Sequence, residues 1–171
     1  MVKSLIVIEQ EQIISKEEIL EALREVMDPE IPVLSVIDLG IIENVEIEDN
    51  AVTVKMIPTF TACPAIKIMQ QQIKEKIVSL GFEDVKVIVD DSVSWNSDRM
   101  SEEAKRKLEK FGLGIPNRHG GEFSLEEIEH SKCPHCGSSD TTMNSLFGST
   151  LCRSIHFCFD CKQSFERFKP L

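Results

Sequence analysis

The strongest chemical signal in this sequence is a set of four cysteines arranged as two C-x-x-C pairs in its last forty residues. Two such pairs present four thiolates, which can close a tetrahedral zinc site. The 21 residues between the pairs suit a β-hairpin. A module this small depends on its metal for much of its folding free energy, on the order of 10 kcal/mol. We therefore predict a structural zinc site, with the ligands Cys133, Cys136, Cys158 and Cys161.

Two other residues of the tail could replace one of these ligands. Cys152 and His156 both lie between the two pairs. The simpler interpretation, which we favour, is a buried structural thiol at Cys152 and a surface imidazole at His156.

The remaining cysteine, Cys63, lies far in sequence from the others, in the stretch PTFTACPAIKIM. A strand is predicted before it and a helix after it, and Pro64 suits the first turn of a helix because its missing N–H costs nothing there. A thiol at a helix start lies near unpaired N–H groups, so we predict that its pKa is lowered. Thr59 and Thr61 are candidate hydrogen-bond donors to it. Cys63 could then be a nucleophile, a metal ligand or a buried structural residue.

The positions of the histidines argue against covalent catalysis by Cys63. A Cys–His hydrolase needs an imidazole base within hydrogen-bond reach of its thiol. The first 118 residues contain no histidine. Metal or sulfur handling needs no such base, so we predict that the chain is not an enzyme. The four histidines are His119, His130, His135 and His156.

The elements that must position Cys63 form a small α/β layer. Ser15-Lys16-Glu17-Glu18 fits a capping box, and Asp28-Pro29 should end the helix that this box begins. Alternating polar and apolar residues over 45–56 predict a hairpin, the periodicity over 64–80 predicts a helix, and residues 85–89 predict a third strand. The predicted fold class is α/β, with a small sheet in α-β-β-α-β order followed by a C-terminal zinc ribbon.

The chain divides into three predicted parts. Ser101 should cap a further helix, and the glycine-rich run GLGIPNRHGGEF after it is typical of a linker. We predict an α/β domain over residues 1–111, a linker over 112–130 and a zinc ribbon over 131–171. Because the α/β domain should have its own core, we expect removal of zinc to unfold the tail and leave that domain largely intact.

Composition and charge narrow the functional classes. The first twelve residues do not form a signal peptide, and no apolar run reaches the length of a membrane span, so we predict a cytoplasmic protein with reduced thiols. The net charge is −10. Residues 131–171 carry five basic and three acidic side chains, a net +2, which leaves −12 on the rest. An acidic body repels phosphate backbones, so we expect neither nucleic acid nor a membrane as partner.

Taken together, these motifs resemble the PaaD family, also called PaaJ, the D component of phenylacetyl-CoA epoxidase systems in phenylacetate catabolism. The resemblance covers about positions 15–171. Its α/β part alone is similar to the wider iron–sulfur assembly family that includes SufT and the eukaryotic cytosolic iron–sulfur targeting subunit. The segments that carry the resemblance are DPEIPVLSVIDLGII, PTFTACPA, WNSDRMSEEAKRKL, CPHCGS and FGSTLCRSIHFC.

The resemblance implies a non-catalytic maturation factor that helps load iron or an iron–sulfur centre into a multicomponent oxygenase of the phenylacetyl-CoA epoxidase type. Its partners would be other subunits of that complex or iron–sulfur assembly proteins, and its cargo would be iron or a transient iron–sulfur cluster. The alternative is a structural or regulatory subunit of the same complex, with the ribbon as a docking surface and Cys63 as a structural residue.

The resemblance also implies cofactor-binding roles for Asp38, in the DLG motif, and for Cys63, in the T-x-x-x-C-P motif. We expect Trp95 to lie with Asp38 beside Cys63 in a shared surface pocket. Thr61-Ala62 replaces the Ser-Gly that is more frequent in the family, which weakens the case for a close, glycine-dependent approach of a ligand. Ile66 occupies the position of the second cysteine of the similar NifU scaffold domain. A cluster would therefore need a homodimer, Asp38 or ligands from a client protein.

Overall fold

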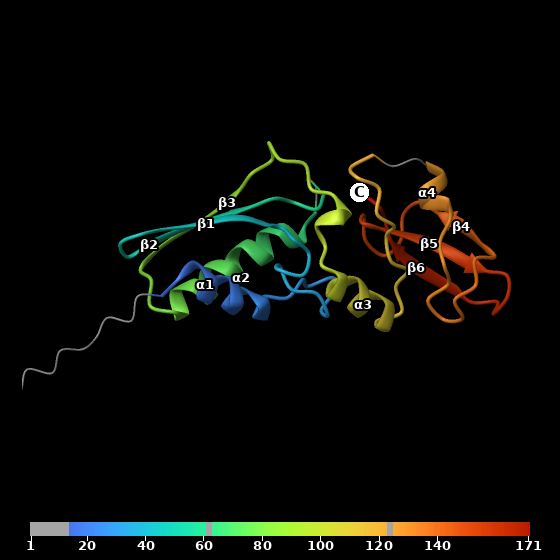
Figure 1. Cartoon of the computed structure of the whole chain (residues 1–171), viewed down its shortest axis with the longest axis horizontal. Helices are drawn as coiled ribbons and strands as arrows, with labels where there is room; N and C mark the ends of the chain where they lie inside the picture. The colour runs from blue at the N-terminus through green and yellow to red at the C-terminus, as the bar shows by residue number, and fades with distance from the viewer. Residues whose placement is uncertain (1–13, 61–62, 123–124) are drawn as a thin grey trace, which may run out of the picture.

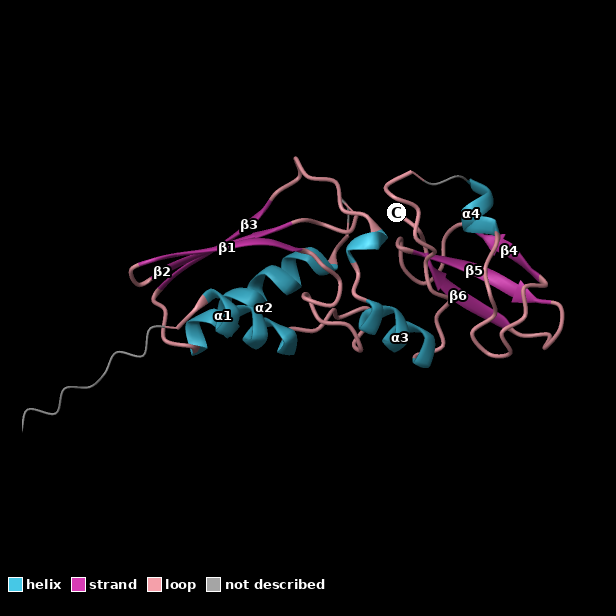
Figure 2. Cartoon of the chain, viewed as in Figure 1, coloured by secondary structure: helices cyan, strands magenta, loops and turns pink. Residues whose placement is uncertain are grey.

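The computed structural model describes residues 14–60, 63–122 and 125–171. Figure 1 shows an elongated molecule with a sheet near each end and helix α3 (Glu102–Lys110) between them. Figure 2 shows helices packed on one of the two sheets, with loops joining the two parts. No helix of the described part of the chain combines the length and the apolar character that a membrane span requires.

Helix α1 (Lys16–Ala22) begins with the predicted capping box. Ser15 Oγ accepts a hydrogen bond from the Glu18 N–H at 3.2 Å, and the Glu18 carboxylate accepts one from the Ser15 N–H at 2.8 Å. The helix continues as a single 3₁₀ turn, η1 (Leu23–Glu25), and ends sooner than predicted. It ends there because Val26 turns to extended backbone and accepts a hydrogen bond from the Val36 N–H.

The first sheet has the predicted order and holds three strands. β1 (Ile42–Glu48) pairs antiparallel with β2 (Ala51–Met56), and β2 pairs parallel with β3 (Asp84–Val89). A parallel pair needs a crossover connection, which α2 (Ala65–Ser79) provides. The apolar face of α2 is fully buried against the sheet at Met69, Ile73 and Ile77. The predicted α/β class and element order are confirmed.

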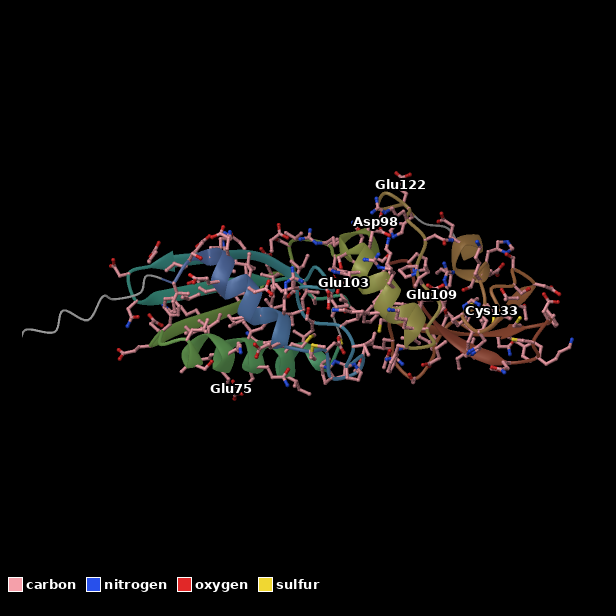
Figure 3. All side chains as sticks on the ribbon, turned by 60° about the horizontal axis from the view of Figure 1, so that its bottom comes forward. Glu75, Asp98, Glu103, Glu109, Glu122 and Cys133 are labelled. Atoms are coloured by element: carbon pink, nitrogen blue, oxygen red, sulfur yellow. The ribbon has the colours of Figure 1, made fainter. Side chains whose placement is uncertain are left out.

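Helix α3 connects the two parts of the molecule. Ser101 caps it as predicted, its Oγ accepting from the Ala104 N–H at 3.0 Å. Ala104 and Leu108 are fully buried, whereas Glu103 and Glu109 are exposed along its other side (Figure 3). The short 3₁₀ helix η2 (Ser97–Arg99) lies just before α3 and contacts the predicted linker. Its Asp98 carboxylate accepts hydrogen bonds from the N–H groups of His119 and Gly120, two residues of that linker.

The tail forms a second sheet of three antiparallel strands. β4 (Thr141–Ser145) and β5 (Arg153–Cys158) make the predicted hairpin between the two cysteine pairs, and β6 (Ser164–Phe168) adds a strand that was not predicted. The predicted linker contains the short helix α4 (Leu125–Glu129). The linker also pairs with β6, through a bridge between Gly114 and Arg167. The approach is close at Gly114, because an added Cβ there would come within 3.1 Å of the Arg167 side chain. The domain boundaries themselves stay predictions.

The larger of two apolar clusters in the described residues runs through both parts, and the smaller one, of Cys133, Cys158 and Phe165, lies in the ribbon. Cys152 and Phe168 of the ribbon belong to the same cluster of buried side chains as the core of the α/β layer. The rings of Trp95 and Phe168 lie 5.9 Å apart, and the Arg153 guanidinium donates to the Glu30 carbonyl oxygen. The ribbon is therefore packed against the α/β layer.

Candidate functional site

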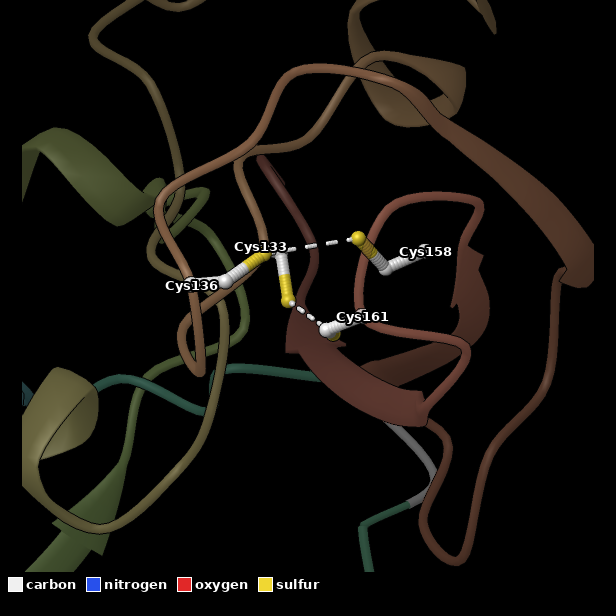
Figure 4. A group of neighbouring side chains, drawn as sticks. All are labelled: Cys133, Cys136, Cys158 and Cys161. Carbon is white, nitrogen blue, oxygen red and sulfur yellow. Dashed lines mark hydrogen bonds between the residues drawn. The ribbon is translucent and has the colours of Figure 1, made fainter.

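Four thiols converge at one end of the ribbon, as Figure 4 shows. All four sulfur atoms lie within 4.8 Å of one another, and the Cys133–Cys161 and Cys136–Cys158 pairs are each 3.6 Å apart. Tetrahedral zinc with Zn–S bonds of about 2.3 Å needs sulfur atoms about 3.8 Å apart. The donor set and its spacing fit such an ion. Zinc as the bound metal stays a prediction.

The two C-x-x-C turns share one backbone geometry. Gly137 N–H donates to the Cys133 carbonyl at 2.8 Å, and Lys162 N–H donates to the Cys158 carbonyl at 3.0 Å. In both turns the residue after the second cysteine is left-handed, with φ of 75° at Gly137 and 59° at Lys162. Each turn thus contains one residue in the left-handed region, where the backbone strain is smallest for glycine.

The two cysteines of the second turn differ in acidity. The backbone N–H groups of Cys161 and Asp160 lower the pKa of Cys158 to about 7. Burial raises the pKa of Cys161 to about 12. The thiolate is the form that binds metal, so Cys158 loses its proton readily, whereas a metal ion would have to displace the proton of Cys161.

The two other candidates for a zinc ligand lie outside the four-sulfur group. Cys152 is buried, as predicted. The prediction for His156 is wrong, because its imidazole is fully buried and stacks on Phe165 with ring centroids 5.4 Å apart. Burial, with the nearby Arg167, lowers the pKa of His156 to about 4, so this side chain is a neutral part of the core.

Cys63 lies just before the N-cap residue of α2, Pro64, at the predicted strand-to-helix turn. Its N–H donates to the Phe60 carbonyl at 2.9 Å, and its own carbonyl accepts from the Ile66 N–H at 3.3 Å. The side chain is partly buried and packs against the shared core. Thr61-Ala62 lies outside the described residues.

The predicted lowering of the Cys63 pKa is wrong. Burial raises the pKa of this thiol, and the hydrogen bond from the Ala65 N–H offsets that effect only in part. The negative charge of Glu30 raises the pKa further. The expected helix-start effect is present, but desolvation outweighs it. Cys63 is therefore a protonated thiol near neutral pH.

Cys63 opens onto a cavity of about 250 Å³ between the two parts of the molecule. From the α/β layer, Glu30 and Phe60 line it beside Cys63. The ribbon contributes the loop before β5, including Leu151 and Cys152, whose Sγ lies 3.1 Å from Thr150 Oγ1. Two cysteines from different modules thus border one cavity.

Asp38 lies elsewhere, in a buried turn. Its carboxylate accepts from the Ser35 N–H at 3.0 Å, while its own N–H donates to Ser35 Oγ at 3.0 Å. The same carboxylate pairs with Lys107 of α3 at 2.7 Å and is 2% exposed. Burial by itself raises the pKa of the Asp38 carboxyl. The hydrogen bonds from Lys107 and Ser35 outweigh that effect and hold the pKa of Asp38 below its ordinary value. This geometry gives Asp38 a role in joining the turn to α3.

Trp95 is buried between the modules. Its indole N–H donates to the Leu39 carbonyl at 2.9 Å, directly after Asp38 in the chain. Neither Trp95 nor Asp38 is among the residues that line the cavity described at Cys63, and the predicted shared pocket stays a prediction. Both side chains are engaged in packing and hydrogen bonds that hold the fold, and their cofactor-binding roles stay predictions.

Comparison with known proteins identifies both parts of the chain. Residues 118–169 match the PaaD zinc beta ribbon domain, and residues 16–89 match the iron–sulfur cluster assembly protein family. An Escherichia coli (strain K12) protein, provisionally named as a component of 1,2-phenylacetyl-CoA epoxidase, is 34% identical over 152 residues, which cover 89% of this chain and 91% of that protein. The chain belongs to the PaaD family.

Other relatives of this PaaD-family chain match its α/β part. The Fe-S protein maturation auxiliary factor of Porphyromonas gingivalis is 43% identical over 96 residues, 55% of this chain and 90% of that protein. The factor YitW of Bacillus subtilis, with the same description, is 32% identical over 54% of this chain and 92% of its own length. A domain of unknown function from Bacillus anthracis has the same fold, with a TM-score of 0.51 over 54% of this chain, 89% of that structure and 24% identity.

Sequence reasoning missed two side chains of the cavity, Cys152 and Glu30. Cys152 lies in the segment FGSTLCRSIHFC, which contributed to the resemblance to PaaD, but its sequence spacing from Cys63 carries no information about contact. The polar loop DPEIP pointed to an ordered turn, without showing that Glu30 would face a thiol.

Proposed function

We propose that this PaaD-family chain is a non-catalytic, cytoplasmic maturation factor that delivers iron or an iron–sulfur centre to an oxygenase of the phenylacetyl-CoA epoxidase type. The observation that carries the proposal is the position of Cys63. Its thiol lies where a domain of the iron–sulfur assembly family meets a PaaD ribbon. The names of the relatives supply two elements of the inference, maturation of iron–sulfur proteins and a connection with phenylacetyl-CoA epoxidase.

The chemistry of the Cys63 thiol supports binding over catalysis. No histidine is found among the described residues that line its cavity, and its raised pKa keeps the thiol protonated. A protonated thiol without a base is a poor nucleophile. A soft metal ion can displace the thiol proton on binding, so the same group remains a competent ligand for iron.

The four-thiol centre has a structural role in this proposal. Zinc held by Cys133, Cys136, Cys158 and Cys161 would fix the two turns that join β5 to β6 and the ribbon to α4. A closed four-coordinate shell leaves no open position for chemistry. It would instead hold the ribbon in the shape that covers Cys63.

A second candidate function is that of a structural or regulatory subunit of the epoxidase complex. The name of the E. coli relative, which describes it as part of that epoxidase, favours this function. In that case Cys63 would serve packing only, and its loss would affect the stability of this chain and the activity of the complex together.

The test is production of the client oxygenase alongside either wild-type chain or Cys63→Ser. We expect the melting temperature of Cys63→Ser to stay within a few degrees of wild type, while the iron content of the purified client falls about tenfold or more. Lys67→Ala, an exposed change on the same helix, serves as the matched control and should leave client iron unchanged. A fully iron-loaded, active client made with Cys63→Ser would contradict the proposal.

A further inference from the structure

Two cysteines from distant parts of the chain border the same cavity. Cys63 lies in the turn before α2, and Cys152 lies directly before β5. Both belong to the apolar cluster that runs through the two modules, Cys152 as a buried member and Cys63 as a partly buried neighbour. The Cys152 backbone is held in place, because its carbonyl accepts a hydrogen bond from the Lys169 N–H at 2.9 Å. The packing of the ribbon on the α/β layer therefore produces a thiol pair that neither module has alone.

The cavity is also lined by the carboxylate of Glu30. Within the described residues this carboxylate takes part in no hydrogen bond or ion pair. The neighbouring carboxylate of Asp28 is engaged, since it accepts from the N–H groups of Glu30 and Ile31 at 2.7 and 2.9 Å. The Arg153 guanidinium is directed to Glu166 at 2.9 Å and to the Glu30 backbone. Among the described residues, only the four ribbon thiols form a group of three or more ligand atoms close enough to hold one ion, so Glu30 contributes a negative charge to the cavity and not a ligand.

The surroundings disfavour ionisation of these groups in the absence of a cation. Burial raises the pKa of both Cys63 and Cys152, and the negative charge of Glu30 adds to each shift. At Cys152 the hydrogen bond with Thr150 and the positive charge of Arg153 offset the rise in part. Burial and the charge of Asp28 also raise the pKa of Glu30. Two protonated thiols and a carboxyl group in a partly desolvated space would all gain from one positive ion in the cavity.

We propose that Cys152 is the second thiol ligand of the cargo site at Cys63, so that a single chain holds one iron centre between its two modules. This inference rests on the proposed function and adds to it a ligand from the ribbon. On binding, each thiol gives its proton to solvent and each sulfur forms a bond to iron, with no change in oxidation state. Thiolate is a soft ligand that selects iron over hard cations.

The site is suited to a cargo that must leave again. Two sulfur ligands fill fewer positions than the four thiolates of a closed structural site. The open positions are available to ligands of a recipient protein. Phe60, Phe147 and Leu151 border the same cavity with exposed apolar side chains. This apolar border lowers the local dielectric constant and so strengthens the attraction between iron and its thiolates.

The first test measures iron binding under anaerobic conditions by zinc-loaded protein, with iron(II) added alone or together with sulfide. We expect wild type to bind iron beyond its zinc, and both Cys63→Ser and Cys152→Ser to bind iron at least about tenfold more weakly. Sulfide analysis separates a single ion from a cluster. Lys67→Ala is the control, because it changes an exposed side chain of α2 that does not line the cavity, and it should retain iron. Wild-type affinity in Cys152→Ser would overturn the inference.

A second measurement needs no variant and covers the case in which Cys152→Ser loses zinc or melts early. X-ray absorption of iron(II) bound to wild type, without sulfide, counts the sulfur atoms around the metal. Two sulfur neighbours support the inference, and one overturns it.

The two proposals fail in distinguishable ways. If Cys152→Ser binds iron normally while client iron still depends on Cys63, the maturation role stands and the shared site is wrong. If both thiols bind iron but the client is loaded equally well without them, the shared site stands and the maturation role is wrong.

Discussion

Asp38 illustrates how one buried side chain can serve the fold in a segment where the family resemblance points to cargo binding. Its carboxylate connects the turn at Ser35 with Lys107 of α3, and it is 2% exposed. Removing one partner of a buried ion pair leaves the other without compensation, which is costly. The same motif residue can thus be essential for folding whether or not it meets iron.

We predict that Asp38→Asn lowers the free energy of unfolding by about 1–3 kcal/mol at pH 7. Because the folded-state pKa of Asp38 is lowered, the stabilisation is complete above the unfolded-state pKa of about 4 and is lost as the pH falls through the folded-state value. The difference between wild type and variant should therefore shrink in strong acid, as measured by urea unfolding across pH. Glu103→Gln is the control, since the exposed Glu103 lies 3.8 Å from the same lysine and should change little.

At the scale of elements, the two cysteine turns are the same structure built twice with different residues. Gly137 supplies the left-handed position in the first turn and Lys162 supplies it in the second. Among the described residues, no atom outside the immediate chain neighbours lies within 4 Å of an added Cβ at Gly137, so a side chain there would meet backbone strain alone. Substitutions at Gly137 and Lys162 therefore measure the cost of the left-handed backbone without a contribution from packing at Gly137.

We predict opposite effects at these two positions. Gly137→Ala should destabilise the ribbon by about 1 kcal/mol, and Lys162→Gly should be neutral or stabilising, because the left-handed region costs a side chain about 1–2 kcal/mol and costs glycine little. Competition with a zinc chelator measures the difference, and about 1 kcal/mol corresponds to about fivefold in zinc affinity. Equal effects of the same sign at both positions would be inconsistent with a shared turn geometry.

Local signals in the sequence were enough to predict most helices and strands. The properties of the candidate site depend on contacts between distant residues, which local signals do not reveal. The capping box at Ser15, the cap at Ser101 and the C-x-x-C pairs each act within a few residues, so their outcomes could be predicted. The Cys63 pKa could not, because desolvation in a cavity that the distant ribbon helps to enclose outweighs the local N–H groups. The same holds for His156, whose burial follows from the packing of β5 and β6.

At the scale of the whole molecule, the shared core changes the expected response to metal loss. The α/β layer was expected to keep its own core, but Phe168 and Cys152 complete the same cluster, and the Ser97 N–H donates to the Leu171 carbonyl at 2.9 Å. Unfolding of the ribbon would expose apolar surface on the α/β layer as well. The two modules should lose stability together.

We predict that removing the ribbon metal with a chelator lowers the melting temperature of the α/β layer as well as that of the ribbon. Trp95 reports on this directly, because it is the one tryptophan of the chain and its ring lies 5.9 Å from Phe168 of the ribbon. Its fluorescence should shift to the red on chelation and return when zinc is restored. An emission spectrum that stays unchanged while zinc is lost would show that the two modules are independent.

The hydrogen bond from Lys169 to the carbonyl of Cys152 has a consequence for the order of events in the cell. It attaches the loop of Cys152 to the chain just after β6, and β6 itself follows the second cysteine turn. A newly made chain that has not yet acquired zinc would lack this anchor and would present Cys63 alone. If Cys152 is the second ligand, zinc must bind before iron does. Only a chain whose ribbon already holds its structural zinc would have both thiols in place to bind the iron cargo.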